Sequence, residues 1–183
     1  MRVIAGSRRH TILKTIEGDS TRPTTDRIKE TLFNMIGPDL YDASFLDLFA
    51  GSGQIGIESL SRGAAHAVFV EKNKKALDCI RDNIKKCEFE NESSIICGDC
   101  YDAIKSGHFP YVFDFVFMDP PYDHLIEKEI LKAIKDRDFI DKDTTIIVEA
   151  SLDTDFSYVS DLGFILIKQK IYKTNQHVFL KLA

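Results

Sequence analysis

The chain has no apolar segment of the kind that enters a membrane. The first ten residues, MRVIAGSRRH, carry charges but no apolar core typical of a signal peptide. No later apolar run approaches the ~18 residues that a helix needs to cross a bilayer. We therefore expect a cytoplasmic protein that makes no membrane contact.

Cysteine is also scarce. The four cysteines, Cys79, Cys87, Cys97 and Cys100, form no disulfide framework for a chain of 183 residues. Only the last two are close in sequence, and a zinc site would need a second close pair of Cys or His residues. We expect four reduced thiols and no metal site.

Linkers, internal repeats and low-complexity segments are absent as well. With 183 residues, 44% of them apolar and 29% charged, the chain is expected to form one globular unit, which we take to be a monomer. The net charge of -5 excludes a uniformly basic nucleic-acid binder, but residues 1–30 carry seven basic and four acidic side chains. This positive end could contact an anionic ligand or could simply be a solvated surface.

Apolar strand patterns alternate with amphipathic helix patterns along the chain. Such alternation predicts a doubly wound α/β fold with a mostly parallel sheet. Two strand patterns at 163–173 and 176–183 have no helix between them and predict an antiparallel hairpin at one edge. The other predicted strands cover 44–50, 66–72, 93–99, 111–119 and 144–150, and helices are predicted after the turn at 51–56 and at 73–87 and 124–138.

A short β-α extension precedes this core. Residues 2–6 and 11–16 have strand patterns, and residues 22–36 have apolar side chains at helical spacing. Thr24 or Thr25 can cap this helix, with Asp26 in its first turn. We therefore divide the chain into an N-terminal extension, 1–40, and a core domain, 41–183.

Unusual residues follow four of the predicted strands. In open α/β sheets, ligands bind at the carboxyl ends of the strands, so these residues are expected to face one cleft. They are the segment from Asp47 to Gly53, Glu71, Asp99, and the segment from Asp119 to Tyr122.

The segment Gly51-Ser52-Gly53-Gln54-Ile55-Gly56 matches GxGxxG, and Glu71 has the spacing expected of an acid that holds a ribose. Alone, this pattern suggests a dinucleotide. Asp47 would repel a pyrophosphate but attract the ammonium group of S-adenosylmethionine (SAM), whose adenine would lie near Asp99. The alternative is purely structural: a capping Asp47, a surface Glu71 and a turn at Asp99.

The stretch Asp119-Pro120-Pro121-Tyr122 ends an apolar run. Asp119 and a carbonyl of the Pro-Pro segment can accept hydrogen bonds from the exocyclic amine of a nucleobase, and the prolines hold these acceptors in place. Tyr122 can stack on an unpaired base. The alternative is a rigid turn that ends a strand. No Pro-Cys pair, the nucleophile of a cytosine-C5 enzyme, is present.

Together these segments resemble a known family. MRVIAG, RPTTDRIKETLFNMI, DLFAGSGQIGIESLSRGA, EKN, DPPY and IIVE look like the RsmD family of 16S rRNA guanine-N2 methyltransferases, over nearly the whole chain. The resemblance implies a class I SAM-dependent methyltransferase with a seven-stranded sheet. It also implies methylation of one guanosine in the 16S rRNA of the small ribosomal subunit.

Site residues follow from the resemblance position by position. Asp119, Pro120, Pro121 and Tyr122 form the reaction set. The cofactor set comprises Asp47, Phe49, Gly51, Gly53, Glu71, Lys72, Asp99, Thr24 and Asp119. The RNA set comprises Arg8, Arg9, Arg22 and Arg27, whose phosphate contacts would make binding salt-dependent. Glu149 occupies an acidic family position whose role the sequence does not reveal.

The chain departs from the family pattern at two places. His10 and Thr11 stand where the family has a glycine and an arginine, and Lys173 stands where it has a glycine. Both departures concern RNA docking rather than chemistry.

Three rival functions remain open. Asp119 can accept both N1–H and N2–H of guanine, but the motif also suits adenine-N6 methylation of DNA or RNA if only the amine is contacted. A NAD-binding module would use only GxGxxG and Glu71, and a non-catalytic rRNA assembly factor only the basic N-terminus. We expect recognition of a preformed RNA shape rather than of a short single strand.

Overall fold

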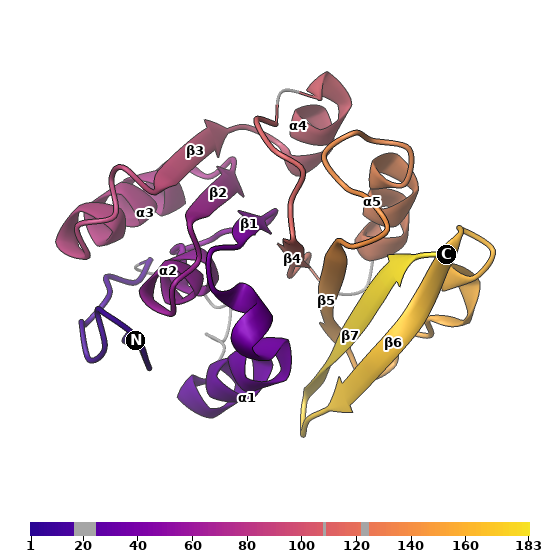
Figure 1. Cartoon of the computed structure of the whole chain (residues 1–183), viewed down its shortest axis with the longest axis horizontal. Helices are drawn as coiled ribbons and strands as arrows, with labels where there is room; N and C mark the ends of the chain where they lie inside the picture. Colours follow the sequence, from indigo (N-terminus) through magenta and orange to yellow (C-terminus); the bar gives the residue numbers. More distant parts are fainter. Residues whose placement is uncertain (17–24, 108, 122–124) are drawn as a thin grey trace.

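A seven-stranded sheet forms the centre of the protein, in the order β3-β2-β1-β4-β5-β7-β6 (Figure 1). The computed structural model describes residues 1–16, 25–107, 109–121 and 125–183. Five strands are parallel: β1 (Ser44–Asp47), β2 (His66–Glu71), β3 (Ser93–Cys97), β4 (Phe115–Met118) and β5 (Thr145–Ser151). β6 (Phe164–Ile171) and β7 (Asn175–Leu182) are antiparallel at one edge, which confirms the predicted hairpin.

Helices cover both faces of the sheet. Strand side chains alternate between the faces, so Phe45 belongs to one core cluster, with Phe33 and Ile80, while its neighbour Leu46 belongs to another, with Ile104 and Leu131. Both residues are fully buried, which explains why the strands have continuous apolar sequences. The doubly wound α/β prediction is confirmed. The helices are α1 (Asp26–Ile36), α2 (Gln54–Ser61), α3 (Lys74–Lys86), α4 (Cys100–Ser106) and α5 (Ile126–Ile134), with short 3₁₀ turns η1 (Gly37–Leu40) and η2 (Ser157–Val159).

Some elements, among them β4 and α4, differ from the sequence prediction. β4 begins at Phe115 rather than at Tyr111, and the side chain of Tyr111 is exposed. Helix α4 was not predicted, because the sequence at Asp99 indicated only a turn. Asp99 instead caps this helix, since its Oδ1 accepts a hydrogen bond from the N–H of Tyr101 at 2.9 Å.

The N-terminal strands are reduced to a single bridge between Arg2 and Ile12. The reason is that the N–H groups of Ile4 and Ala5 donate to the carboxylate of Glu58 in α2, at 2.8 and 3.0 Å, instead of to a neighbouring strand. The N-terminal segment thus lies against α2 (Figure 1).

Glu58 is buried and also contacts two cations. Nζ of Lys29 lies 3.4 Å and Nε of Arg62 2.8 Å from its carboxylate. Lys29 is buried too, and this burial lowers the pKa of its ammonium group. These contacts join the first residues, α1 and α2 in one packed unit. The division at residue 40 stays a prediction.

Among the helices of the described residues, none combines the length and the apolar character needed to span a membrane.

Candidate active site at the carboxyl ends of the parallel strands

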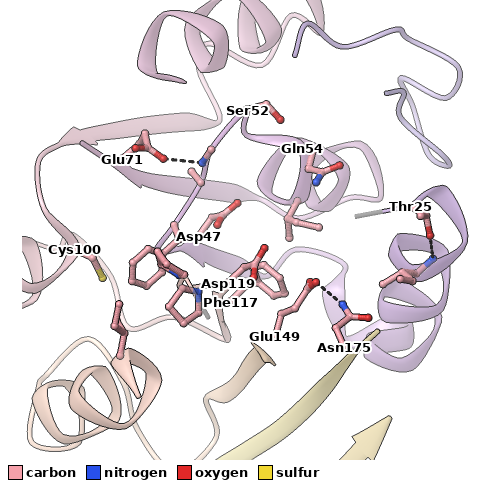
Figure 2. A pocket seen from close by; sticks show the side chains of 18 of the residues that line it. Thr25, Asp47, Ser52, Gln54, Glu71, Cys100, Phe117, Asp119, Glu149 and Asn175 are labelled. Atoms are coloured by element: carbon pink, nitrogen blue, oxygen red, sulfur yellow. Dashed lines mark hydrogen bonds between the residues drawn. The ribbon is translucent and has the colours of Figure 1, made fainter. Parts of the chain in front are cut away.

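A cavity of about 1450 Å³ opens where the parallel strands end. Its walls come from α1, the Gly-rich turn, the ends of β1, β2, β4 and β5, the start of α4, and the β6–β7 turn (Figure 2). Parallel strands place their carboxyl ends at one edge of the sheet, and the register sets Asp47 opposite both Phe69 of β2 and Phe117 of β4. Side chains far apart in sequence therefore meet here.

The Gly-rich turn is held by Glu71. Oε2 of Glu71 accepts a hydrogen bond from the N–H of Gly51 at 2.9 Å, and its Oε1 accepts from the N–H groups of Lys72 and Asn73. Gly51 and Gly53 have φ values of 54° and 78°, in the left-handed region that favours glycine. Glu71 and Gly51 line the cavity, whereas Gly53 is the N-cap of α2 behind it.

The third glycine of the motif has a packing role. A Cβ on Gly56 would lie 2.3 Å from the ring of Phe69 in β2. Only glycine therefore lets α2 approach the sheet closely enough for its first turn to reach the end of β1.

Asp47 is buried at the end of β1, with 1% of its surface exposed. Its Oδ2 accepts a hydrogen bond from the N–H of Gly56 at 3.3 Å, whereas its Oδ1 has no partner among the described residues. Burial, with a smaller contribution from the nearby charge of Glu71, raises the pKa of this carboxyl to about 7. A cation placed in the cavity would stabilise the ionised form.

Asp119 follows β4 and faces two other carboxyl groups. Figure 2 shows Asp47, Asp119 and Glu149 side by side along the cavity. Burial, then the charge of Glu149 and then that of Asp47, raise the pKa of Asp119 well above its usual range. Without a cationic ligand, Asp47 and Asp119 therefore ionise less readily than ordinary carboxyl groups.

Glu149, whose role the sequence did not reveal, belongs to a buried hydrogen-bond network. Its Oε1 accepts from the amide Nδ2 of Asn175, and its Oε2 lies 3.0 Å from Nε2 of His177. Nδ1 of His177 lies 3.2 Å from the hydroxyl of Tyr172. An ionised carboxylate can only accept, so Nε2 of His177 carries the proton in that contact. These bonds fix the orientation of the Glu149 side chain beside Asp119.

Sequence reasoning missed Asn175, His177 and Tyr172. Asn175 and His177 reach the site because β7 runs antiparallel to β5, with His177 opposite Glu149 and Asn175 opposite Ser151. Tyr172 lies between β6 and β7. The hairpin pattern predicted the strands but not this register, and no motif marks Asn175 or His177.

Asp99 and Lys72 form the outer part of the cavity. Nζ of Lys72 donates to Oδ2 of Asp99 at 2.9 Å, and this bond, together with the N–H of Tyr101, lowers the pKa of Asp99. Phe49 supplies an apolar wall. Cys100 and Tyr101, which the sequence did not indicate, also line this part because α4 begins here.

The remaining predicted site residues fall into three groups. Pro120, Pro121 and Arg27 line the cavity. Thr24, Arg22 and Tyr122 lie outside the described residues. Arg8 and Arg9 lie away from the cavity.

Arg8 lies away from the cavity, at the end of the sheet where the parallel strands begin. Its backbone N–H donates to Ser61 at the end of α2, and its guanidinium contacts the carbonyl of Cys87 and the carboxylate of Glu88, both at 2.6 Å, after the end of α3. Helices α2 and α3 both begin near the cavity and end at the opposite end of the sheet. Arg9 is next to it in this turn, so neither residue approaches the cavity.

Buried oxygen atoms without partners show what the cavity can bind. Three residues that line it have such an atom: Oδ1 of Asp47, Oε1 of Gln54 and Oδ1 of Asn175. All three are hydrogen-bond acceptors. Because a buried acceptor without a donor is unfavourable by about 1–3 kcal/mol, the cavity suits a ligand rich in N–H and O–H groups.

The four cysteines are free, as expected. Within the described ranges, no group of three or more His, Cys, Asp or Glu side chains could hold a metal ion.

Comparison with known proteins places the chain in a family. Residues 1–181 match the profile of the family described as "Conserved hypothetical protein 95". YlbH of Bacillus subtilis is 41% identical over 150 residues, which cover 81% of this chain and 82% of that protein. "Ribosomal RNA small subunit methyltransferase D" of Haemophilus influenzae is 32% identical over 172 residues, which cover 93% of this chain and 88% of that protein.

Solved structures have the same architecture. Escherichia coli yhhF superposes with a TM-score of 0.82 at 27% identity, covering 100% of this chain and 97% of that one. The fold, the site motifs and the match along nearly the whole length agree, and the chain belongs to the RsmD family, described as conserved hypothetical protein 95.

Proposed function

We propose that the protein transfers a methyl group from SAM to the exocyclic N2 amine of a guanosine in 16S rRNA of the small ribosomal subunit. The observation that carries this proposal is the cavity itself, where buried carboxyl groups and unpartnered acceptors surround a space at the strand ends. Such a site complements a cationic cofactor and a base rich in N–H donors. The relatives named for small-subunit rRNA methylation support the substrate.

SAM fits the acceptors on the first side of the cavity. We assign its ammonium group to Asp47, whose free Oδ1 needs a donor. We assign its ribose to Glu71, which has used three of about four acceptor positions and has one left on Oε2. When bound, SAM supplies a methyl group on a positively charged sulfur. The remaining proposed contacts are Phe49, Gly51, Gly53, Lys72, Asp99, Thr24 and Asp119.

The second side of the cavity would receive the base. An ionised Asp119 can accept N1–H and N2–H from the Watson–Crick edge of guanine, and Pro120 and Pro121 hold that carboxylate in place. Localising the amine lone pair makes N2 a better nucleophile. After transfer, the surplus proton on the nitrogen leaves to Asp119 or to water, so no other strong base is needed. Tyr122 is proposed to stack on the base.

A cationic cofactor would also prepare Asp119 for this role. The pKa of Asp119 is raised because its charge is buried near Glu149 and Asp47. A nearby positive charge favours the ionised form and reverses this shift. The two ligands would therefore bind cooperatively, since the cofactor converts Asp119 into the acceptor that guanine requires.

One observation favours adenine-N6 methylation as the second candidate. If Asp119 kept its proton, it would donate a hydrogen bond to N1 of adenine, which is an acceptor. A dinucleotide enzyme is disfavoured by the structure, because a pyrophosphate would meet the carboxyl groups of Asp47 and Glu71 at the Gly-rich turn.

The proposal is tested by binding and transfer together. We expect SAM, but not NAD, to bind in a calorimetric titration, and labelled methyl to enter 16S rRNA of unmodified small subunits. Asp119→Asn should abolish the label, whereas Asp136→Asn in the exposed turn after α5 should leave it unchanged. Transfer that survives Asp119→Asn would contradict the proposed site.

A further inference from the structure

Four cationic side chains line the cavity: Arg27 of α1, Lys72 after β2, Lys170 of β6, and Lys173 in the β6–β7 turn. Lys72 is paired with Asp99 at 2.9 Å. The other three are exposed and have no carboxylate partner in the part of the chain that the structure describes. We call Arg27, Lys170 and Lys173 the cation rim.

The cation rim lies on two walls of the cavity. Arg27 is on α1, and both lysines are on the hairpin that forms the other wall; α1 and the β6–β7 turn lie near one another at the same end of the molecule (Figure 1). Within the cavity the charges have the opposite sign, from Asp47, Asp119 and other acidic side chains. The site is thus acidic inside and basic at its edge.

A small cationic cofactor gains nothing from this rim, which would repel it. The arrangement instead fits a ligand with a donor-rich head and anionic groups beside it. A nucleotide within RNA has this form, because its base presents N–H donors while the flanking phosphates are negative. With the base inside, the phosphates would lie at the edge, where the three cations are.

Lysines on β6 have a competing explanation. β6 is an edge strand, and charged side chains on edge strands prevent pairing with other chains. That explanation covers Lys168, whose Nζ lies 5.9 Å from the ring of Phe179 and which does not line the cavity. It does not cover Lys173, which is in the turn beyond the strand, or the position of Arg27 on the facing helix.

The basic residues of the N-terminal turn are placed differently. Arg8 is already paired with Glu88, and its guanidinium lies over the ring of Phe89 at 5.7 Å. It lies at the edge of the sheet opposite the cavity, as does the adjacent Arg9. A phosphate next to a base held at Asp119 would be far from both arginines.

We infer that Arg27, Lys170 and Lys173 bind the backbone phosphates that flank the target nucleotide, so that α1 and the β6–β7 turn clamp the RNA strand on either side of the cavity. This inference rests on the proposed function, because it names the surface by which the same site takes its RNA. Lys173 is also the position at which the chain departs from the family pattern. The departure adds a cation to this surface.

The test is the salt dependence of RNA binding by the full chain. Removing one phosphate contact is expected to reduce the slope of log K against log salt by about 0.7–0.9. We expect Lys170→Ala/Lys173→Ala to lower the slope for unmodified 16S rRNA by about 1.4–1.8 and to weaken binding at least tenfold at low salt. Adding Arg27→Ala to the double variant should lower the slope by about a further 0.7–0.9, the value for one phosphate contact.

Lys168→Ala is the matched control on the same strand and should leave the slope and the affinity unchanged. SAM affinity measured by calorimetry should not fall in any variant, which excludes misfolding as the cause. An unchanged slope in the double variant, an equal loss in Lys168→Ala, or no RNA binding by the wild type would overturn the inference.

The result also separates the inference from the proposed function. A wild type that methylates 16S rRNA, with a double variant that binds and methylates normally, would refute the cation rim alone. A wild type that binds this RNA through the rim but transfers no methyl group would support the rim and refute the proposed function.

Discussion

The residues of the two cavity walls are positioned by different features of the fold. The wall made by β1, β2 and β4 consists of residues at the carboxyl ends of parallel strands or directly after them, such as Asp47, Glu71 and Asp119. The opposite wall consists of α1 and the β6–β7 hairpin, whose residues Asn175 and Arg27 follow no strand-end rule. The residues of the first wall are positioned by their place at the strand ends. The residues of the second wall are positioned by the register of the hairpin and the packing of α1.

This difference explains what the sequence could predict. Parallel strands have to end at one edge, so the meeting of Asp47, Glu71, Asp99 and Asp119 followed from the order of strands and turns. The fold class followed from the same alternation. Whether each residue has its proposed role is a separate matter, which the experiments below address.

The hairpin wall could not be predicted in the same way. A strand pattern gives the existence of β7, but a shift of one residue would turn its side chains to the other face. Only the observed register sets His177 opposite Glu149 and orients Asn175 toward it. Helix α4 was missed for another reason: it has only seven residues, too few for a clear period, and Asp99 reads equally as a turn or a cap.

The largest effect is expected on the strand-end wall at Asp119. Asp119→Asn keeps the shape but removes one acceptor and introduces a donor toward guanine N1–H. We expect kcat/KM for rRNA methylation to fall about 10³-fold, as for other preorganised polar groups. Because the lost charge was buried beside Glu149 and Asp47, the Tm should not fall. A fall of several degrees with normal activity would contradict this role.

The next effect is expected at Asp47. Asp47→Asn retains an acceptor for the N–H of Gly56 but removes the charge proposed to meet the ammonium group. A charge-assisted bond contributes about 1.5–3 kcal/mol, so SAM affinity should fall about 10- to 100-fold in calorimetry. The ligand-free variant at pH 8 should be at least as stable as the wild type. Unchanged affinity would place the ammonium group elsewhere.

Asn175 tests the hairpin wall. Asn175→Ala leaves Glu149 with His177 but removes one donor, and we expect unfolding free energy to fall by about 1–3 kcal/mol. Methylation should fall about tenfold because Glu149 is no longer held beside Asp119, while SAM affinity changes little. Lys168→Ala on the adjacent strand is the control. Equal losses of SAM affinity and methylation would show that the two walls are not separable.

The smallest effect is the pH dependence of SAM binding. The pKa of Asp47 is about 7 in the ligand-free protein, so its protonated, neutral form dominates below that pH. SAM affinity should therefore rise several-fold from pH 6 to pH 8, and this dependence should weaken in Asp47→Asn. Calorimetric titrations at both pH values would show it. A SAM affinity that falls as the pH rises would contradict the proposed contact between the ammonium group and Asp47.

The same group affects stability in the opposite direction. A carboxyl whose pKa is raised on folding binds more protons in the folded state between its unfolded value, near 4, and about 7. Its contribution to the stability of the ligand-free protein is therefore lost as pH rises through this range. Saturating SAM should offset that loss by favouring the ionised form.

The most direct test of the account identifies the base and the atom that receive the methyl group. Unmodified small subunits would be incubated with the protein and labelled SAM, and the 16S rRNA digested to nucleosides and resolved by mass spectrometry. The account predicts label in N2-methylguanosine, absent with Asp119→Asn. Label in N6-methyladenosine would contradict the guanine assignment.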